Sequence, residues 1–468
     1  MIGDLKPYAA MKDSGVPWLR EAPEHWEVRK LRYVLRRVTE RGRPDLPLLS
    51  VVREKGVILR DPAHTDENHN FIPDDLSNYR VVRVGQFVIN KMKAWQGSYG
   101  VSRHDGIVSP AYFVFALAGV ETRFAHSALR SRAYVPFFAQ ASDGVRIGQW
   151  DLAEARMREI SLLVPPAREQ ATIVHLLDHI ERRIQRYIRA KQKVIALLNE
   201  QKQGMIHHIV TRGLDSNVRR KSSGLEWLGA VPEHWEIRRN GQMFVQRNEM
   251  GFAELPILEV SLRTGVQIRD FGSSVRKQVM SDRTKYKRGA KGDIAYNMMR
   301  MWQGAGGVVP TDGLVSPAYI VATPREGIEL RYFGHLFRTS SYMGEVDRYS
   351  RGIVKDRNRL YWEDFKQMPS PCPPTKEQAQ IADAIDERTQ ILTEAIDQAE
   401  CEIKLMREYR TRLVADVVTG KVDVREAAAK VPEEAEELEL GEEVGAAEEV
   451  EDLEDEIDGG NGVHGAEA

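Results

Sequence analysis

Two Trp-Gln-Gly motifs, at residues 95–97 and 302–304, carry side chains that could bind a nucleic acid. A glutamine amide can pair with the edge of adenine, and an indole ring can stack on a base. Lysines and arginines near these motifs, and beside the later turns at Gly144 and Gly352, could contact phosphates. The candidate nucleic-acid-binding residues are Lys91, Lys93, Gln96, Arg103, Arg146, Lys285, Lys287, Arg288, Arg300, Gln303, Arg351, Lys355 and Arg357. A solvated surface charge remains the alternative for each basic residue taken singly.

The two Trp-Gln-Gly motifs occupy corresponding places in an internal repeat, which also allows a purely structural role. Two copies that bind different ligands should share mainly their scaffold residues. We therefore interpret Trp95 and Trp302 as buried framework, and Gly97 and Gly304 as turn residues.

Known catalytic motifs are absent from the sequence. It contains no Gly-x-x-x-x-Gly-Lys-Ser/Thr loop, no His-Glu-x-x-His, no Gly-x-Ser-x-Gly and no Gly-x-Gly-x-x-Gly after a strand. The Ser-Pro-Ala-Tyr stretch at residues 109–112 only distantly imitates the tetrapeptide of amino-methyltransferases. His25 and His234 each precede a Trp in a repeated motif, which favours packing over metal binding or general-base catalysis. We expect no catalytic residue and no metal site.

The elements that carry these residues are duplicated, with an offset of 207 to 209 positions between the copies. Ser-Gly-x-x-Trp-Leu and Pro-Glu-His-Trp-Glu occur in residues 14–27 and again in residues 223–236. The Trp-Gln-Gly and Val-Ser-Pro-Ala-Tyr blocks follow in the same order in both copies. Short β-like runs at residues 46–60 and 255–269 open each copy. The repeat predicts two mixed α/β domains on one scaffold with different loops.

Each predicted domain is followed by a long amphipathic helix that begins at a Pro-Pro-x-x-Glu-Gln motif, at residues 165–170 and 373–378. Some 43 helical residues would span about 65 Å, which is roughly twice the helix length that a compact domain needs to cover its own core. Apolar residues recur every three or four positions, which predicts that the helices pair as an antiparallel coiled coil. The predicted seam consists of Ile173, Leu177, Ile180, Ile184, Leu198 and Met205 on one helix, and Ile381, Ile385, Leu392, Met406 and Leu413 on the other.

The predicted fold class is therefore mixed α/β (α+β), with two globular domains that alternate with two long helices in a pseudo-two-fold internal repeat. We place the first domain at residues 1–164 and its helix at 165–211, the second domain at 212–372, its helix and connector at 373–424, and an acidic tail at 425–468. The connector after the first helix, at residues 221–224, resembles the amino-terminal lead-in at residues 12–15, so the order of the parts is effectively cyclic and the two chain ends should meet. The composition of the tail predicts disorder.

Charge is unevenly distributed along the 468 residues. Residues 431–468 contain 16 Asp or Glu and no Lys or Arg, so residues 1–430 hold all 67 basic residues against 53 acidic ones. This surplus favours a polyanionic partner, although an Arg-rich solvated surface is the alternative. Two cysteines and the lack of a signal peptide or an apolar stretch of membrane-spanning length predict a soluble, cytoplasmic protein with no membrane partner.

Taken together and in order, the duplicated motifs resemble those of the specificity subunit of type I restriction-modification enzymes. The resemblance spans residues 12 to about 424. It implies a non-catalytic subunit whose two target-recognition domains each read half of a bipartite, asymmetric DNA site. It also implies that the helices set the spacer and dock two methyltransferase subunits, together with two motor-nuclease subunits. S-adenosylmethionine, ATP and Mg are then expected on the partner subunits, and none on this chain.

Two other classes of function stay open at this point. One is an enzyme in its own right, against which the missing motifs speak. The other is a coiled-coil interaction scaffold without DNA-reading activity, or the specificity part of a related methyltransferase-nuclease complex. Salt-dependent binding to a duplex would separate a DNA-reading protein from a scaffold.

Overall fold

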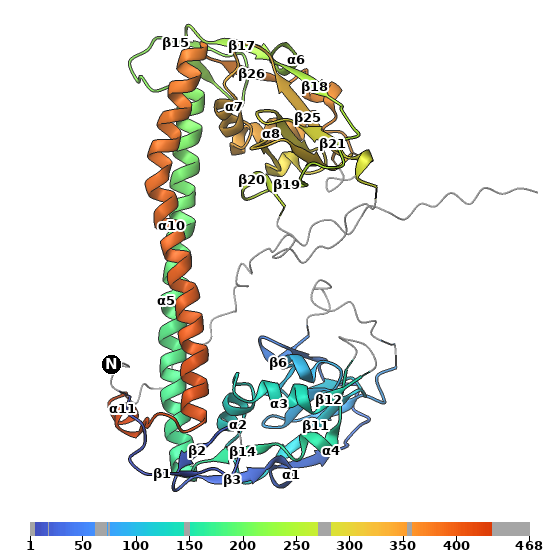
Figure 1. Cartoon of the computed structure of the whole chain (residues 1–468), viewed down its shortest axis with the longest axis vertical. Helices are drawn as coiled ribbons and strands as arrows, with labels where there is room; N and C mark the ends of the chain where they lie inside the picture. The colour runs from blue at the N-terminus through green and yellow to red at the C-terminus, as the bar shows by residue number, and fades with distance from the viewer. Residues whose placement is uncertain are drawn as a thin grey trace, which may run out of the picture. The chain divides into compact units, whose positions relative to one another are not determined.

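The computed structural model describes residues 5–16, 18–60, 73, 75–144, 150–269, 282–352 and 358–432. The chain forms two compact units, one made of Met1–Arg182 and Arg410–Ala468, the other of Arg183–Tyr409. Two long helices, α5 (Ala167–Arg212) and α10 (Thr375–Val418), each contribute to both units (Figure 1). We call the globular parts of the two units domain 1 and domain 2.

Domain 1 is built on a four-stranded antiparallel sheet with the order β4-β11-β8-β9. Its strands are β1 (Met11–Asp13), β2 (Glu21–Pro23), β3 (Glu27–Lys30), β4 (Leu35–Val38), β5 (Leu49–Val52), β6 (Gly56–Leu59), β7 (Arg80–Val82), β8 (Phe87–Asn90), β9 (Tyr99–Val101), β10 (Gly106–Val108), β11 (Tyr112–Leu117), β12 (Ser142–Asp143), β13 (Asp151–Leu152) and β14 (Ser161–Val164). Its helices are α1 (Leu31–Val34), η1 (Ala94–Gln96), α2 (Thr122–Leu129), α3 (Val135–Gln140) and α4 (Glu154–Met157), and the same unit contains α11 (Arg425–Ala429).

Domain 2 repeats this topology, because its sheet order β18-β25-β22-β23 matches that of domain 1 strand for strand. Its strands are β15 (Arg220–Ser222), β16 (Ala230–Pro232), β17 (Glu236–Arg239), β18 (Phe244–Arg247), β19 (Leu258–Ser261), β20 (Gly265–Ile268), β21 (Lys287–Gly289), β22 (Ile294–Asn297), β23 (Gly306–Val308), β24 (Gly313–Val315), β25 (Tyr319–Pro324) and β26 (Pro369–Cys372). Its helices are α6 (Asn240–Met243), η2 (Arg283–Lys285), η3 (Met301–Gln303), α7 (Leu330–Leu336), α8 (Ser340–Tyr349) and α9 (Trp362–Phe365). The internal repeat is confirmed.

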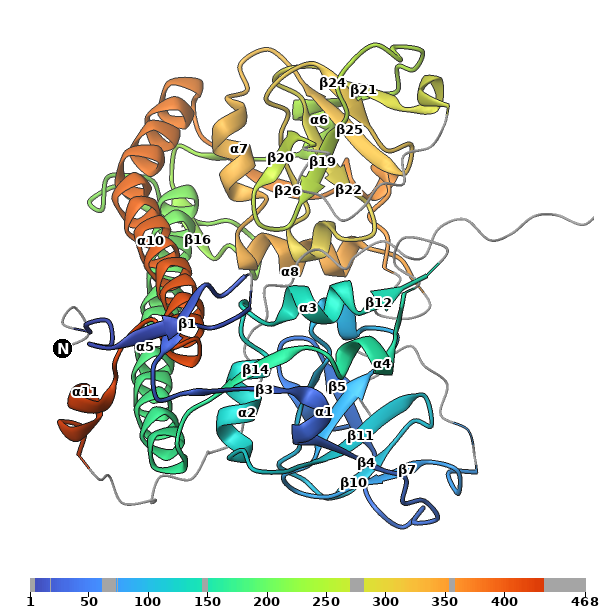
Figure 2. The same ribbon diagram turned by 60° about the horizontal axis from the view of Figure 1, so that its bottom comes forward.

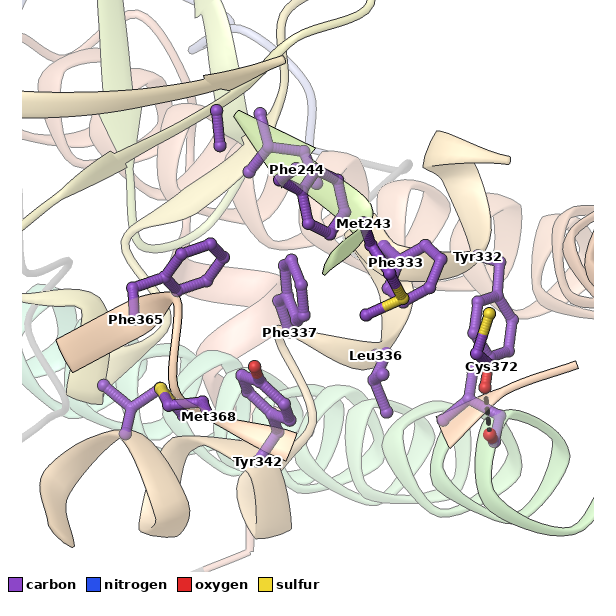
Figure 3. Close-up of a cluster of buried hydrophobic side chains, with 14 of the residues drawn as sticks. Met243, Phe244, Tyr332, Phe333, Leu336, Phe337, Tyr342, Phe365, Met368 and Cys372 are labelled. Carbon is purple, nitrogen blue, oxygen red and sulfur yellow. Dashed lines mark hydrogen bonds between the residues drawn. The ribbon is translucent and has the colours of Figure 1, made fainter. Parts of the chain in front are cut away.

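The core of domain 2 includes the ends of both long helices. Phe244 of β18 packs on Phe333 of α7 with ring centroids 5.4 Å apart, inside the buried cluster drawn in Figure 3. Ile209 of α5 and Ile381 of α10 belong to the same cluster. Full burial of such a side chain stabilises a fold by about 1.5–3 kcal/mol. The helix ends are therefore part of the domain rather than attachments to it.

The helices α5 and α10 run antiparallel, as the sequence predicted. In the second unit, Lys191 of α5 pairs with Glu402 of α10 at 2.6 Å, and Lys202 donates to Thr393 at 2.7 Å. In the first unit, Glu181 pairs with Arg410. As the residue number on α5 rises, the number of its partner residue on α10 falls, as it does in antiparallel helices. Two α/β domains of one topology and an antiparallel pair of long helices confirm the predicted fold class.

Burial along the helices follows the predicted seam in most places. Ile173, Leu177, Ile180, Ile184, Ile381, Ile385 and Leu413 are buried, whereas Leu198, Met205, Leu392 and Met406 are half-buried. Buried apolar residues that the predicted seam omitted include Ile188, Ile206, Ile209, Ile396 and Ile403. Tyr187 and Val194, which the same periodicity places on the seam, are exposed.

The amino-terminal lead-in and the carboxyl-terminal connector meet inside the first unit. The Asp423 N–H donates to the Lys6 carbonyl at 2.7 Å, and the two residues form an antiparallel bridge. Gly420 adopts a left-handed φ of 71°, and a Cβ there would come within 2.4 Å of Pro23. The predicted meeting of these two segments is confirmed. Among the described helices, we find none with a stretch long and apolar enough to cross a membrane.

Candidate nucleic-acid interface

The repeated Pro-Glu-His-Trp and Pro-Pro-x-x-Glu-Gln motifs meet at the start of each long helix. In the first unit, Glu169 accepts from the Tyr8 hydroxyl at 2.6 Å and from Trp26 Nε1 at 3.2 Å. His25 Nε2 lies 2.7 Å from the other carboxylate oxygen. A carboxylate in the first turn also interacts favourably with the helix dipole. We call this arrangement the helix-start clamp.

The helix-start clamp of the second unit is built in the same way. Glu377 accepts from Trp235 Nε1 at 3.0 Å, and His234 Nε2 lies 2.7 Å from its second oxygen. The neighbouring Gln378 donates to the Pro373 carbonyl at 2.7 Å and accepts from the Glu329 N–H at 2.9 Å. These motifs therefore fasten each domain to its helix. Among the described residues, no group of three or more His, Cys, Asp or Glu side chains is placed to hold a metal ion.

The Trp-Gln-Gly motifs form 3-10 turns that end in a left-handed glycine. Gly97 and Gly304 have φ values of 95° and 94°, which favour glycine because it lacks a Cβ. Trp302 Nε1 donates to the Met299 carbonyl at 3.0 Å. Trp95 lies against Trp150 with ring centroids 5.2 Å apart. Both motif tryptophans are half-buried, whereas the sequence predicted that they are buried.

In domain 1, the predicted basic residues lie in different settings. Lys91 pairs with Asp151 at 3.0 Å, whereas Lys93 is exposed and Gln96 is half-buried. Arg103 is exposed and lies near Asp178 of α5, where burial raises the pKa of the carboxyl group and the charges of Arg123, Arg103 and Arg182 partly oppose that rise. Arg146 lies outside the described residues.

In domain 2, several predicted residues have intramolecular partners. Arg288 pairs with Glu249 at 3.0 Å and with Asp312 at 2.8 Å. Lys287 is half-buried and donates to a backbone carbonyl at 2.9 Å, and its burial lowers its pKa. The remaining candidates are Lys285, which pairs with Asp282 at 3.7 Å, Arg351, which pairs with Asp364, Arg300, which is half-buried, and Gln303, which is exposed. Lys355 and Arg357 lie outside the described residues.

Sequence reasoning missed a group of arginines on domain 1. Arg37 of β4 lies with its guanidinium carbon 4.2 Å from the centroid of the Phe113 ring and pairs with Glu154. Arg158 pairs with the same carboxylate at 3.0 Å. Arg41 and Arg80 form a backbone bridge beside them. We call the surface formed by Arg37, Arg41, Arg80, Phe113, Glu154 and Arg158 the arginine face. The sequence does hold a signal for this face, because its residues differ between the two copies of the repeat. A search for shared motifs keeps only the residues that both copies have in common, so it passes over this signal.

Sequence reasoning also missed two buried arginines, Arg130 and Arg338, which have a structural role. Arg130 donates to the Arg53 and Glu54 carbonyls at 2.9 and 2.8 Å, and Arg338 donates to the Leu262 and Arg263 carbonyls at 2.8 and 2.7 Å. Burial lowers the pKa of both guanidinium groups. Each arginine thus holds the turn of one hairpin, β5–β6 or β19–β20.

Comparisons with known proteins bear on these two domains and helices. No protein-family model matches the chain. A Methanocaldococcus jannaschii protein, provisionally named as the MjaX type I restriction enzyme specificity subunit, is 19% identical over 245 residues. That match covers 46% of this chain and 52% of the relative, so the chain spans about half the length of the curated relative.

Solved structures match over a larger part of the chain. A chain from a structure concerned with complex assembly and conformational transition of the type I R-M system covers 85% of this chain and 98% of its own length, with a TM-score of 0.57 and 14% identity. The HsdS subunit from Thermoanaerobacter tengcongensis covers 86% and 98%, with a TM-score of 0.41 and 15% identity. The first match shows a shared fold. With the sequence match, it confirms that the chain is similar to the specificity subunits of type I restriction-modification systems.

Proposed function

We propose that this chain is the non-catalytic, sequence-specific DNA-recognition subunit of a type I restriction-modification complex. Each domain reads one half of a bipartite, asymmetric site. The observation that carries the proposal is the repetition of one topology, fastened to its helix by the same clamp, with different side chains on the two surfaces. A scaffold kept constant while its surface varies suits two independent recognition tasks.

In this proposal the long helices hold the half-sites apart and dock the partner subunits. Two methyltransferase subunits bring S-adenosylmethionine, and two motor-nuclease subunits bring ATP and Mg. The antiparallel ion pairs between α5 and α10 support a stiff spacer, because they bind the helices along their length. The name of the matched relative as a specificity subunit supports the assignment of partners.

Methylome sequencing of the host, with and without the gene, tests the recognition function. A bipartite methylated-adenine motif should disappear on deletion and return when the gene is restored. The purified chain alone should neither transfer methyl groups nor cleave DNA. A methylome that does not change on deletion would contradict the proposal, as would methyl transfer by the chain alone.

The spacer function has its own test. Four residues inserted in frame into each long helix, at partnered positions, lengthen each by about 6 Å, close to two base pairs. Selection of binding sites from randomised DNA should then return the same half-sites with a longer spacer. The original spacer would contradict the idea that the helices measure distance.

The alternative function is a coiled-coil interaction scaffold that does not read DNA. The exposed apolar residues Ile391 and Leu405 on α10 favour it, since such residues on a long helix suit protein contacts. Salt-dependent binding to duplex DNA, strengthened by the methyltransferase, would exclude the scaffold alternative.

A further inference from the structure

The arginine face of domain 1 gathers four arginines from three separate segments of the chain, which are β4 with the residues after it, β7, and the end of α4. Arg37 of β4 and Arg158 after α4 share Glu154, and the Arg37 guanidinium lies over the Phe113 ring. Arg41 follows β4, and Arg80 begins β7 and donates to a backbone carbonyl at 3.1 Å. The elements β4, β7, β11 and α4 that carry the face appear together in Figure 2.

Positive charge on the arginine face exceeds the negative charge that faces it. The one carboxylate of the face, that of Glu154, pairs with Arg37 and Arg158, whereas Arg41 and Arg80 lie beside each other in a backbone bridge. Burial, followed by the charges of Arg37 and Arg41, lowers the pKa of Arg80, whereas Glu154 raises it. Like charges held this close repel one another, and an anion bound among them would relieve that repulsion.

The corresponding face of domain 2 differs while its backbone is the same. Arg37 pairs with Phe115 across β4 and β11, and Gln246 pairs with Ala322 in the matching register of β18 and β25. The Arg41–Arg80 bridge is matched by a bridge between Met250 and Lys287. In domain 2, Gln246, Met250 and Lys287 take the places of Arg37, Arg41 and Arg80. Likewise, Ile320 takes the place of Phe113, Trp362 that of Glu154, and Lys366 that of Arg158.

This exchange replaces four arginines by two lysines, a glutamine and a methionine. Of the two lysines, Lys366 pairs with Glu363, and Lys287 donates to a carbonyl at 2.9 Å. The exposed side chain of Met250 stands where domain 1 has Arg41. Guanidinium groups bind phosphate through two parallel hydrogen bonds and stack on rings, which neither methionine nor lysine does. The difference is therefore chemical as well as electrostatic.

We propose that the arginine face is the surface through which domain 1 holds the phosphates of duplex DNA, and that domain 2 holds its half of the DNA with fewer phosphate contacts at the matching surface. The inference rests on the proposed function, which it extends to particular residues. It explains how one scaffold grips two half-sites differently. Binding through domain 1 then depends more steeply on salt than binding through domain 2.

The test uses the full-length chain, with its methyltransferase partner where needed, and a fluorescein-labelled duplex of about 30 base pairs of mixed sequence. Fluorescence anisotropy over a salt series gives the affinity and its salt slope. The variant R37Q/R41Q/R158Q removes three cations of the face, and the control R20Q/R53Q/R132Q removes three from elsewhere on the first unit. Each lost phosphate contact should lower the slope by about 0.9, so the test variant should lose about 3 and at least about tenfold in affinity.

The salt slope of the control variant should fall by less than the value expected for the loss of one phosphate contact. Thermal unfolding verifies that each variant is folded, and the exposed single variant R41Q, with an expected slope loss of about 0.9, replaces the triple variant if that one does not fold. Equal losses in the test and control variants would overturn the inference and leave the proposed function standing. If the wild-type chain with its methyltransferase partner showed no salt-dependent binding to the duplex, the proposed function itself would be overturned.

A gain-of-binding variant tests the correspondence of the two faces. Q246R/M250R places two of the missing arginines on domain 2. It should steepen the salt slope by up to about 1.8 and tighten binding to the same duplex. An unchanged slope would overturn the inference that the matching surface of domain 2 lies along DNA.

Discussion

The hydroxyl of Tyr342 in domain 2 belongs to a buried polar triangle that has no counterpart in domain 1. It accepts from Asn240 Nδ2 at 2.8 Å and from Ser370 Oγ at 3.2 Å. Ser370 Oγ also lies 2.8 Å from Asn240 Oδ1. All three residues are completely buried, so the polar side chain of each depends on those of the other two.

A single proline explains why domain 2 contains the triangle. In domain 1, the hydroxyl of Tyr134 accepts from the Leu163 N–H at 3.0 Å. The matching position in the β17–β26 ladder is Pro371, which has no N–H to donate. Asn240 supplies the missing donor. The residues at the positions of Asn240 and Ser370 in domain 1 are Leu31 and Leu162, both buried.

Asn240→Leu should therefore destabilise domain 2 although it adds apolar volume. Tyr342 would lose its best donor and Ser370 one partner, and each group left buried without its hydrogen bond costs about 1–3 kcal/mol. We expect a net loss of about 2 kcal/mol. Adding Ser370→Leu and Tyr342→Phe removes all three polar groups, and this triple variant should return to within about 1 kcal/mol of the wild type.

Hydrogen exchange of the full chain measures the effect locally. Amides of β17 and β26 should exchange up to about 30-fold faster in Asn240→Leu, because about 2 kcal/mol corresponds to that factor. The matching ladder β3–β14 in domain 1 is an internal control and should not change. Unchanged exchange in β17–β26, or a triple variant no better protected than the single one, would refute the reasoning.

Three further outcomes follow from other contacts. Glu377→Ala should cost about 2–3 kcal/mol in local stability at the start of α10, because Trp235 loses its acceptor, whereas Glu377→Gln should keep that bond and cost less. Gly304→Ala should destabilise the chain more than Gly97→Ala in chemical denaturation, since an added Cβ would meet a methionine sulfur at 2.8 Å at position 304 but nothing closer than 3.7 Å at position 97. His126→Gln should flatten the acid side of the stability profile, measured by unfolding at several pH values.

The His126 prediction has a defined sign and pH window. Burial, then the charges of Arg130 and Arg103, lowers the pKa of the imidazole to about 3, and its Nδ1 accepts from the Val101 N–H at 3.1 Å. The unfolded chain takes up this proton below about pH 6.5, while the folded chain resists it. The contribution of His126 to the free energy of unfolding is therefore fully present above that pH. It is lost as the pH falls toward 3, by up to about 1.4 kcal/mol per pH unit.

Outcomes that contradict these predictions are equally specific. Equal losses for Glu377→Ala and Glu377→Gln would show that the clamp does not depend on its acceptor atoms. Equal losses at the two glycines would mean that backbone strain outweighs the contact. A pH profile of His126→Gln parallel to that of the wild type would place the acid sensitivity on other groups.

The amino-acid pattern alone predicted the repeat and the antiparallel helices. The first long helix is expected at residues 165–211, and α5 spans Ala167–Arg212. Such features are encoded locally, because apolar periodicity and a Pro-Pro start act within a few turns of one helix. Repetition of whole motifs then indicates one scaffold used twice.

Only the tertiary structure decided which charges stand together. Arg158 pairs with Glu154 four positions before it, but Arg37 of β4 reaches the same carboxylate from 117 positions away, and nothing in the local sequence of either encodes that meeting. The donor to Tyr342 likewise comes from a residue about 100 positions away. Side-chain partners across a sheet depend on strand register and on what neighbouring loops leave open, and a sequence read along one dimension does not contain these distances.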